Sequence, residues 1–126
     1  MSGDEKLVEW VGRSKAELLD FPRAAIRRAG RELGLVQEGE EPEDWRPMET
    51  IGPGACEIRV RTHEGGTVQH RVIYVARFAE AVYVLHAFQK TTRATSQHNI
   101  DVARARYAQM LRERDAHGNT RKGGMR

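Results

Sequence analysis

Three strand-like segments joined by short connections occupy the middle of the chain, and this feature constrains the fold most. Apolar and polar residues alternate strictly in Cys56–Arg61, and β-favouring residues dominate Val68–Ala76 and Ala81–Phe88. A period of two residues is typical of a strand with one buried face. Short connections place consecutive strands antiparallel, and Glu64–Gly66 is typical of a hairpin turn. These segments therefore predict an antiparallel meander.

The faces of the strands follow from the same pattern. The third segment is apolar on both sides, which predicts a central position in the sheet. The first segment has one apolar face and one charged face. Its core-facing residues are expected to be Cys56, Ile58 and Val60, and its outward-facing residues Glu57, Arg59 and Arg61.

A short strand and two helices are expected before the meander. Leu7–Val11 has strand-forming residues, and Ser14–Glu17 has the spacing of a capping box at a helix start. Proline disrupts a helix interior, so Pro22 predicts a break and then a second helix over Pro22–Leu33. Gly34 is expected to end that helix.

An acidic segment, Gln37–Pro47, separates these helices from the meander. We expect most of it to be a solvated linker, with Trp45 as a packing anchor. An alternative is that the segment contributes to a partner interface. Met48–Ile51 is expected to form a brief strand before the turn at Gly52–Gly54.

The last expected element is a helix that Thr95 or Ser96 caps. The apolar positions of that helix are Ile100, Ala103, Tyr107 and Met110 or Leu111. The predicted fold is α+β: a twisted, mainly antiparallel sheet with an N-terminal helical pair and a C-terminal helix packed on it. We expect the helices to cover one face, and residues 1–115 to form one domain followed by a flexible basic tail, 116–126.

Length and composition narrow the class of protein. With 126 residues, 39% hydrophobic content and a net charge of +3, the chain fits one compact domain with a charged surface. No apolar run is long enough to span a membrane, and Met1–Glu9 mixes charges from the start, so we expect a cytoplasmic protein. Cys56 is the sole cysteine, and we expect it to pack as a small hydrophobe.

Several chemistries find no support in the residues. The five histidines show no metal-ligand spacing, and we interpret His86 as a buried, hydrogen-bonded residue. The glycine pairs join strands to strands, whereas phosphate-binding loops open onto helices. No nucleophile motif is present. We therefore expect no metal and no cofactor.

Basic residues on the meander are the remaining candidates. Arg59, Arg61, Arg71 and Lys90 are expected to converge on one surface near Arg93. Clustered cations can hold a phosphodiester and stabilise its transition state, and a lysine crowded by arginines loses its proton more readily. The same surface would also suit an acidic partner without any chemistry.

The motifs add a family resemblance. The residues Glu57-Ile58-Arg59-Val60-Arg61, Arg71-Val72-Ile73-Tyr74-Val75-Ala76, Val82 to Lys90 and Asp101-Val102-Ala103-Arg104 resemble the phage-derived, HigB-like branch of the RelE/ParE toxin superfamily. The resemblance implies the toxin of a type II toxin–antitoxin pair. Such toxins are ribosome-dependent mRNA endonucleases that inhibit translation, and they cut without a metal ion by using the 2′-hydroxyl of the RNA.

The resemblance also implies roles for individual residues. Arg59, Arg71 and Lys90 match catalytic basic residues, and Arg61 and Arg93 match supporting RNA contacts. Some members of the superfamily carry a tyrosine near the start of the final helix. His98 is near the matching place here, so it is a candidate acid or base.

Two other functions remain open. A ParE-like chain would poison DNA gyrase without cutting RNA, and a non-catalytic prophage protein would only bind an antitoxin. The implied partners are mRNA on the ribosome and a small helix-turn-helix antitoxin, HigA-like, encoded next to the toxin.

Overall fold

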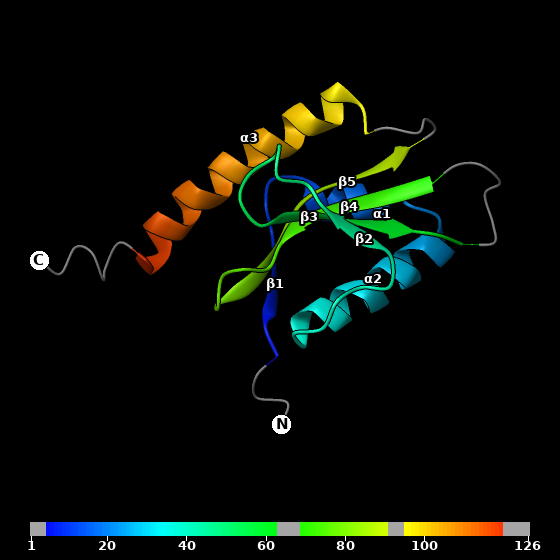
Figure 1. Cartoon of the computed structure of the whole chain (residues 1–126), viewed down its shortest axis with the longest axis horizontal. Coiled ribbons are helices and arrows are strands. Elements are labelled where there is room, and N and C mark those ends of the chain that lie inside the picture. The colour runs from blue at the N-terminus through cyan, green and yellow to red at the C-terminus, as the bar shows by residue number, and fades with distance from the viewer. Residues whose placement is uncertain (1–4, 63–68, 91–94, 120–126) are drawn as a thin grey trace, which may run out of the picture.

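The structure, a computed structural model, describes residues 5–62, 69–90 and 95–119 (Figure 1). Its fold is α+β, as predicted, with one sheet between helices. In chain order the elements are β1 (Leu7–Trp10), α1 (Ser14–Leu19), α2 (Arg23–Gln37), β2 (Trp45–Pro47), β3 (Ala55–Val60), β4 (Gln69–Val75), β5 (Ala81–Lys90), α3 (Gln97–Arg114) and the turn η2 (Asp115–Asn119).

The sheet has the strand order β1-β5-β4-β3-β2. Strands β2 to β5 pair antiparallel with their neighbours, which confirms the predicted meander, and β1 pairs parallel with β5. Strand β5 lies between β1 and β4, as its two apolar faces indicate. The predicted hairpin turn at 64–66 lies outside the described residues.

Strand β2 corrects one prediction. The strand before the glycine turn is Trp45–Pro47 and not Met48–Ile51, because Met48 and Ile51 turn inward and are buried in the core. Pro47 lacks an amide hydrogen for a sheet ladder, and it sits at the end of a short strand at the sheet edge, where that loss matters least.

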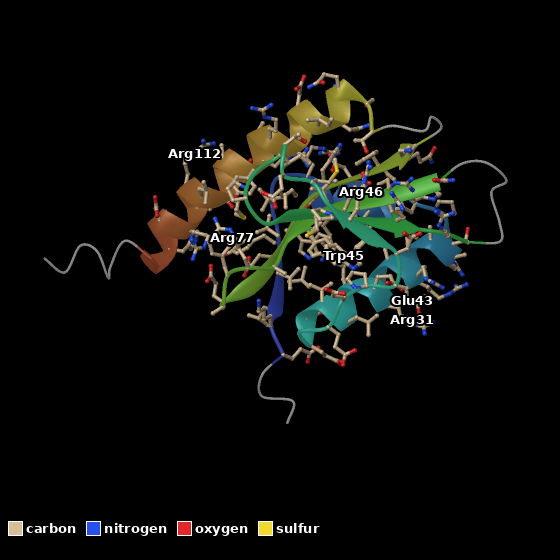
Figure 2. The ribbon with its side chains drawn as sticks, viewed as in Figure 1. Arg31, Glu43, Trp45, Arg46, Arg77 and Arg112 are labelled. Carbon is tan, nitrogen blue, oxygen red and sulfur yellow. The ribbon has the colours of Figure 1, made fainter. Side chains whose placement is uncertain are left out.

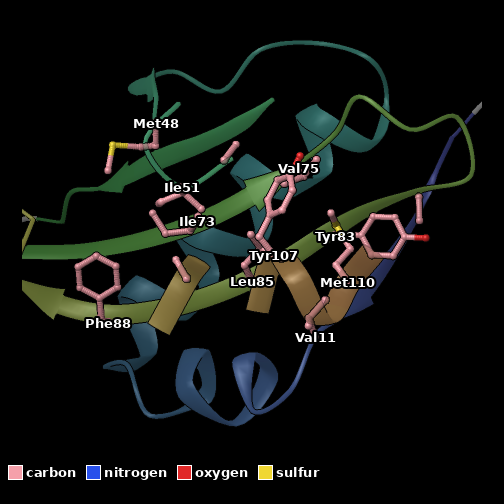
Figure 3. Close-up of a cluster of buried hydrophobic side chains, with 13 residues drawn as sticks. Val11, Met48, Ile51, Ile73, Val75, Tyr83, Leu85, Phe88, Tyr107 and Met110 are labelled. Atoms are coloured by element: carbon pink, nitrogen blue, oxygen red, sulfur yellow. The ribbon is translucent and has the colours of Figure 1, made fainter. Parts of the chain in front are cut away.

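Helices cover both faces of the sheet, whereas we expected them to cover one. On one face, α1 and α2 pack through Leu18, Ala29 and Leu33 against residues that include Ile58 and Val72. On the other face, α3 packs through Ala103, Tyr107 and Met110 against residues that include Ile73 and Leu85 (Figure 3). The physical reason is that β4 and β5 present apolar side chains on both faces, and each face needs a covering layer.

The N-terminal helices differ from the prediction at two positions. Ser14 lies inside α1, so the predicted capping box is wrong; its side chain is buried, and Glu17 reaches other elements instead. Helix α2 continues past Gly34 to Gln37, because Val36 extends the apolar stripe into the core. The predicted break at Pro22 is present, and Pro22 precedes the first residue of α2.

Glu17 joins α1 to β5 and α3. Its Oε1 accepts hydrogen bonds from the Ala87 amide at 3.2 Å and from Arg106 Nη1 at 3.0 Å, and it lies 2.8 Å from His86 Nδ1. Burial raises the pKa of Glu17, but the hydrogen bonds from Arg106 and His86 outweigh burial and lower the pKa to about 2. Glu17 thus supplies a hydrogen-bond acceptor to the part of β5 that extends beyond its pairing with β1. His86 is buried and hydrogen-bonded, as we predicted.

Helix α3 confirms the predicted cap and face. The Ser96 side chain accepts a hydrogen bond from the Asn99 amide at 3.2 Å. Met110 is in the core, whereas Leu111 is exposed. After Asn119 the predicted tail lies outside the described residues, so the domain boundaries stay a prediction. No helix of the described chain has the length and apolar character needed to cross a bilayer.

Candidate functional site

The register of the meander brings three predicted catalytic residues onto one face of the sheet. Arg59 of β3 stands opposite Arg71 of β4, and Gln69 of β4 stands opposite Lys90 of β5. Alternate residues of a strand share a face, so Arg71 and Gln69 point to the same side. Arg59, Arg71 and Lys90 are therefore neighbours on the face that carries α3.

Two more arginines extend this group. Arg46 of β2 pairs in register with Glu57 and so lies on the same face (Figure 2), and Arg61 follows the last residue of β3. We call the five cations Arg46, Arg59, Arg61, Arg71 and Lys90 the basic cluster. Two carboxylates, Glu57 and Asp44, hold it from opposite ends.

Glu57 lies at the base of the basic cluster with a fully buried side chain (0% exposed). Its Oε1 accepts a hydrogen bond from Arg46 Nε at 3.0 Å and lies 3.6 Å from Arg71 Nε. Its Oε2 accepts a hydrogen bond from Thr95 Oγ1 at 2.7 Å. Burial of an unpaired charge is costly, so these partners explain how a carboxylate is tolerated here. Glu57 thereby ties β2, β3, β4 and the start of α3 together.

Arg71 and Lys90 form the buried end of the cluster, at 4% and 6% exposed. Arg71 Nη2 donates to Gln69 Oε1 at 2.8 Å. Burial lowers the pKa of Arg71, and burial followed by the repulsion from Arg71 lowers the pKa of Lys90. Lys90 therefore releases its proton more readily than an exposed lysine does, which is the direction predicted from crowding alone.

Arg59 and Arg61 form the exposed end, with side chains 30% and 59% exposed. Both hold Asp44: Arg59 Nη1 donates to Oδ1 at 3.3 Å, and Arg61 Nε donates to Oδ2 at 2.6 Å. Burial raises the pKa of Asp44, but Arg61 and Arg59 outweigh it and lower the pKa.

The acidic segment is therefore more than the solvated linker that we expected. Asp44 pairs with the basic cluster, and its neighbour Glu43 pairs with Arg28 and Arg31 of α2 (Figure 2). Trp45 is half-buried on β2, in keeping with its predicted packing role. Asp44 thus ties this segment to the basic cluster, and Glu43 ties it to α2.

Two predicted site residues remain, His98 and Arg93. His98 is exposed in the first turn of α3. Thr95, three positions earlier, contacts Glu57, so the start of this helix lies beside the cluster, but no hydrogen bond or ion pair of the described residues joins His98 to it. Arg93 lies outside the described residues.

Sequence reasoning missed several members of the site. Alternation along β3 placed Glu57 correctly on the face of Arg59 and Arg61, but as an outward-facing residue, whereas its side chain is fully buried. Arg46 and Thr95 become neighbours of Glu57 only through the register of β2 and the path into α3, which no local pattern records. In the described part of the chain, no group of three or more His, Cys, Asp or Glu side chains could hold a metal ion.

Comparison with known families places this site in context. The model of the family described as phage derived protein Gp49-like (DUF891) matches residues 16–108. The chain belongs to that family. It is a RelE/ParE-like toxin family, so the predicted superfamily is confirmed, and the matched range contains every residue of the basic cluster. A search of curated proteins finds no match to the chain.

Proposed function

We propose that this Gp49-like protein is the toxin of a type II toxin–antitoxin pair and acts as a ribosome-dependent mRNA endonuclease of the HigB-like branch. Membership of a RelE/ParE-like toxin family supports the toxin role. The observation that carries the proposed chemistry is the gathering of Arg59, Arg71 and Lys90 on one face of the sheet.

Such a group suits cleavage by the RNA itself. In this reaction the 2′-hydroxyl attacks the adjacent phosphorus, and the bond from phosphorus to the 5′-oxygen breaks. The products are a 2′,3′-cyclic phosphate and a free 5′-hydroxyl, so one proton leaves the nucleophile and one reaches the leaving group. The protein has to align these atoms and stabilise a phosphorane that carries extra negative charge. No step of this scheme requires a metal ion.

The residues divide these tasks by position. Arg59 and Arg71 stand opposite each other and are suited to hold the phosphorane oxygens from two sides. Lys90 adds a third cation, and its lowered pKa suits a part in proton transfer. His98 stands in the first turn of the nearby helix as a candidate acid or base. Arg61 and Arg93 are proposed as supporting RNA contacts.

The partners and the location follow from the family. We propose a cytoplasmic protein that acts on mRNA in the ribosome and is inhibited by a HigA-like, helix-turn-helix antitoxin. The family supports an antitoxin partner in general.

The test is to map cuts on a translated message with the wild-type protein, Lys90→Ala and Arg112→Ala. Arg112 is an exposed arginine near the other end of α3, so its loss matches the change in charge without touching the cluster. We expect Lys90→Ala to cut at least about 100-fold more slowly, which is typical when a group that stabilises the transition state is lost. Arg112→Ala is expected to cut like the wild type.

An uncut message with folded wild-type protein would contradict the proposal, as would full cutting by Lys90→Ala. DNA damage signalling with intact transcripts would select the gyrase poison instead.

One observation favours a protein that only binds its antitoxin. Arg71 and Lys90 are nearly buried in the free protein, so RNA has to open a path before a phosphate reaches them. Antitoxin binding by a folded chain that never cuts ribosome-bound message would establish that function.

A further inference from the structure

The Asp44 carboxylate bridges two guanidinium groups at the exposed end of the basic cluster. Each of its oxygens accepts a hydrogen bond from a different arginine, Oδ1 from Arg59 at 3.3 Å and Oδ2 from Arg61 at 2.6 Å. Two neighbouring guanidinium groups are also the arrangement that binds a phosphate, because an anion with several oxygens can accept from both. An anion-binding site is therefore already formed there, and the carboxylate of Asp44 fills it.

Only the side chain of Asp44 has to move to empty this site. The main chain of Asp44 is held on the sheet, because the Arg59 amide donates to the Asp44 carbonyl oxygen at 2.8 Å. The Asp44 side chain is 31% exposed and Arg61 is more exposed still, so a ligand in solvent can reach the pair. Exposed ion pairs contribute little to stability, and exchange of one anion for another is therefore inexpensive.

We propose that Arg59 and Arg61 form a phosphate subsite for RNA and that Asp44 occupies this subsite until an RNA phosphate displaces it. The inference rests on the proposed function in naming RNA as the ligand. Displacement of Asp44 frees both arginines at the open side of the cluster while Glu57 keeps its buried partners. The first phosphate to bind thus meets Arg59 and Arg61, beside the two buried cations.

An alternative role for Asp44 predicts the opposite result. A carboxylate that only holds Arg59 and Arg61 in place would support RNA binding, and its removal would weaken binding. A carboxylate that competes with phosphate opposes RNA binding, and its removal strengthens binding. The sign of the change in affinity therefore separates the two roles.

The experiment measures binding of a fluorescent 2′-O-methyl oligoribonucleotide, which has no free 2′-hydroxyl and stays intact. Wild type, Asp44→Asn and Glu43→Gln are compared by anisotropy over a series of KCl concentrations. The two variants change the net charge equally, but Glu43 pairs with Arg28 and Arg31 of α2 and not with the cluster.

We expect Asp44→Asn to bind about 3- to 10-fold more tightly at low salt. The gain over the wild type should shrink as the KCl concentration rises, because salt screens the competition between the Asp44 carboxylate and the phosphate. Glu43→Gln should stay within about twofold of the wild type. Adding Arg61→Gln to Asp44→Asn should remove the gain, since the freed arginine is then absent.

Weaker or unchanged binding by Asp44→Asn would overturn the subsite, as would an equal gain in Glu43→Gln or no binding by any of the proteins. If Asp44→Asn does not fold, wild type compared with Arg61→Gln decides, because the subsite requires weaker binding in Arg61→Gln. The proposed function fails separately: tighter binding by Asp44→Asn together with uncut message in the wild type would refute cleavage and keep the subsite.

Discussion

Glu57 and Asp44 both hold arginines of the basic cluster, but one carboxylate is fully buried and the other is 31% exposed. Glu57 has three partners from three parts of the chain, whereas Asp44 has two partners on one strand and its end. Water can replace the partners of Asp44 but not those of Glu57. A carboxylate–arginine pair therefore fixes structure when it is buried and stays exchangeable when it faces solvent.

This difference divides the site into a fixed part and an adjustable part. Arg71 and Lys90 share the buried end with Glu57, so their positions are set when the protein folds. Arg59 and Arg61 share the exposed end with Asp44, so their partner can change on binding. In the proposed function, Arg71 and Lys90 would be held still while the ligand enters beside Arg59 and Arg61.

The largest expected effect is the loss of the buried carboxylate. Glu57→Ala leaves Arg71 and Arg46 without their anion, and removal of one partner of a buried pair costs about 3–5 kcal/mol. The free energy of unfolding in urea should fall by that amount. Asp44→Ala, measured beside it, should lose less than about 1 kcal/mol. Equal losses of unfolding free energy in the two variants would show that burial does not separate the roles of Glu57 and Asp44.

Glu17 provides an intermediate case, because its side chain is 21% exposed and bridges α1, β5 and α3. Its pKa is lowered from 4.5 to about 2 in the folded protein. Its contribution to stability is therefore complete above pH 4.5 and is lost as the pH falls toward 2. The free energy of unfolding of Glu17→Gln should be about 2 kcal/mol lower at neutral pH, because this variant lacks the charged hydrogen bonds from Arg106.

The measurement for Glu17 is the free energy of unfolding at a series of pH values. Below about pH 4 the difference between wild type and Glu17→Gln should shrink. Glu9→Gln, which changes an exposed glutamate, serves as the control and should follow the wild type. A difference that stays constant down to pH 2 would show that the charge of Glu17 does not carry its effect.

The smallest effect on stability is expected at His98. Its side chain is exposed, so His98→Ala should change the free energy of unfolding by no more than about 0.5 kcal/mol. If the start of α3 takes part in proton transfer beside the buried end, cutting of ribosome-bound message should slow by about 100-fold. Unchanged cutting would remove His98 from the catalytic set.

The strands of the meander were predictable because their signal is local. Alternation along Cys56–Arg61 records which side chains share a face, and the short connection after β4 fixes the antiparallel order. These two facts predict that Arg59 and Arg71 share one surface, whereas their position opposite each other depends on the register of β3 with β4. Lys90 follows in the same way from the antiparallel pairing of β4 with β5.

The parts that could not be predicted depend on distant partners. Glu17 has the spacing of a capping box, but its carboxylate binds Arg106, 89 positions away, and the Ala87 amide, 70 positions away. Glu57 was placed on the correct face, yet its burial depends on Thr95, 38 positions later. Gly34 is typical of a helix end, and tertiary packing of Val36 carried α2 past it.

The chemistry of the cut ends tests most directly whether the basic cluster promotes attack by the RNA 2′-hydroxyl. Message cut during translation by the wild-type protein should carry a 5′-hydroxyl on one fragment and a 2′,3′-cyclic phosphate, or the phosphate from its opening, on the other. Lys90→Ala should reduce the yield of those ends by about 100-fold. Fragments with a 5′-phosphate and a 3′-hydroxyl, or growth arrest with intact message, would contradict the account.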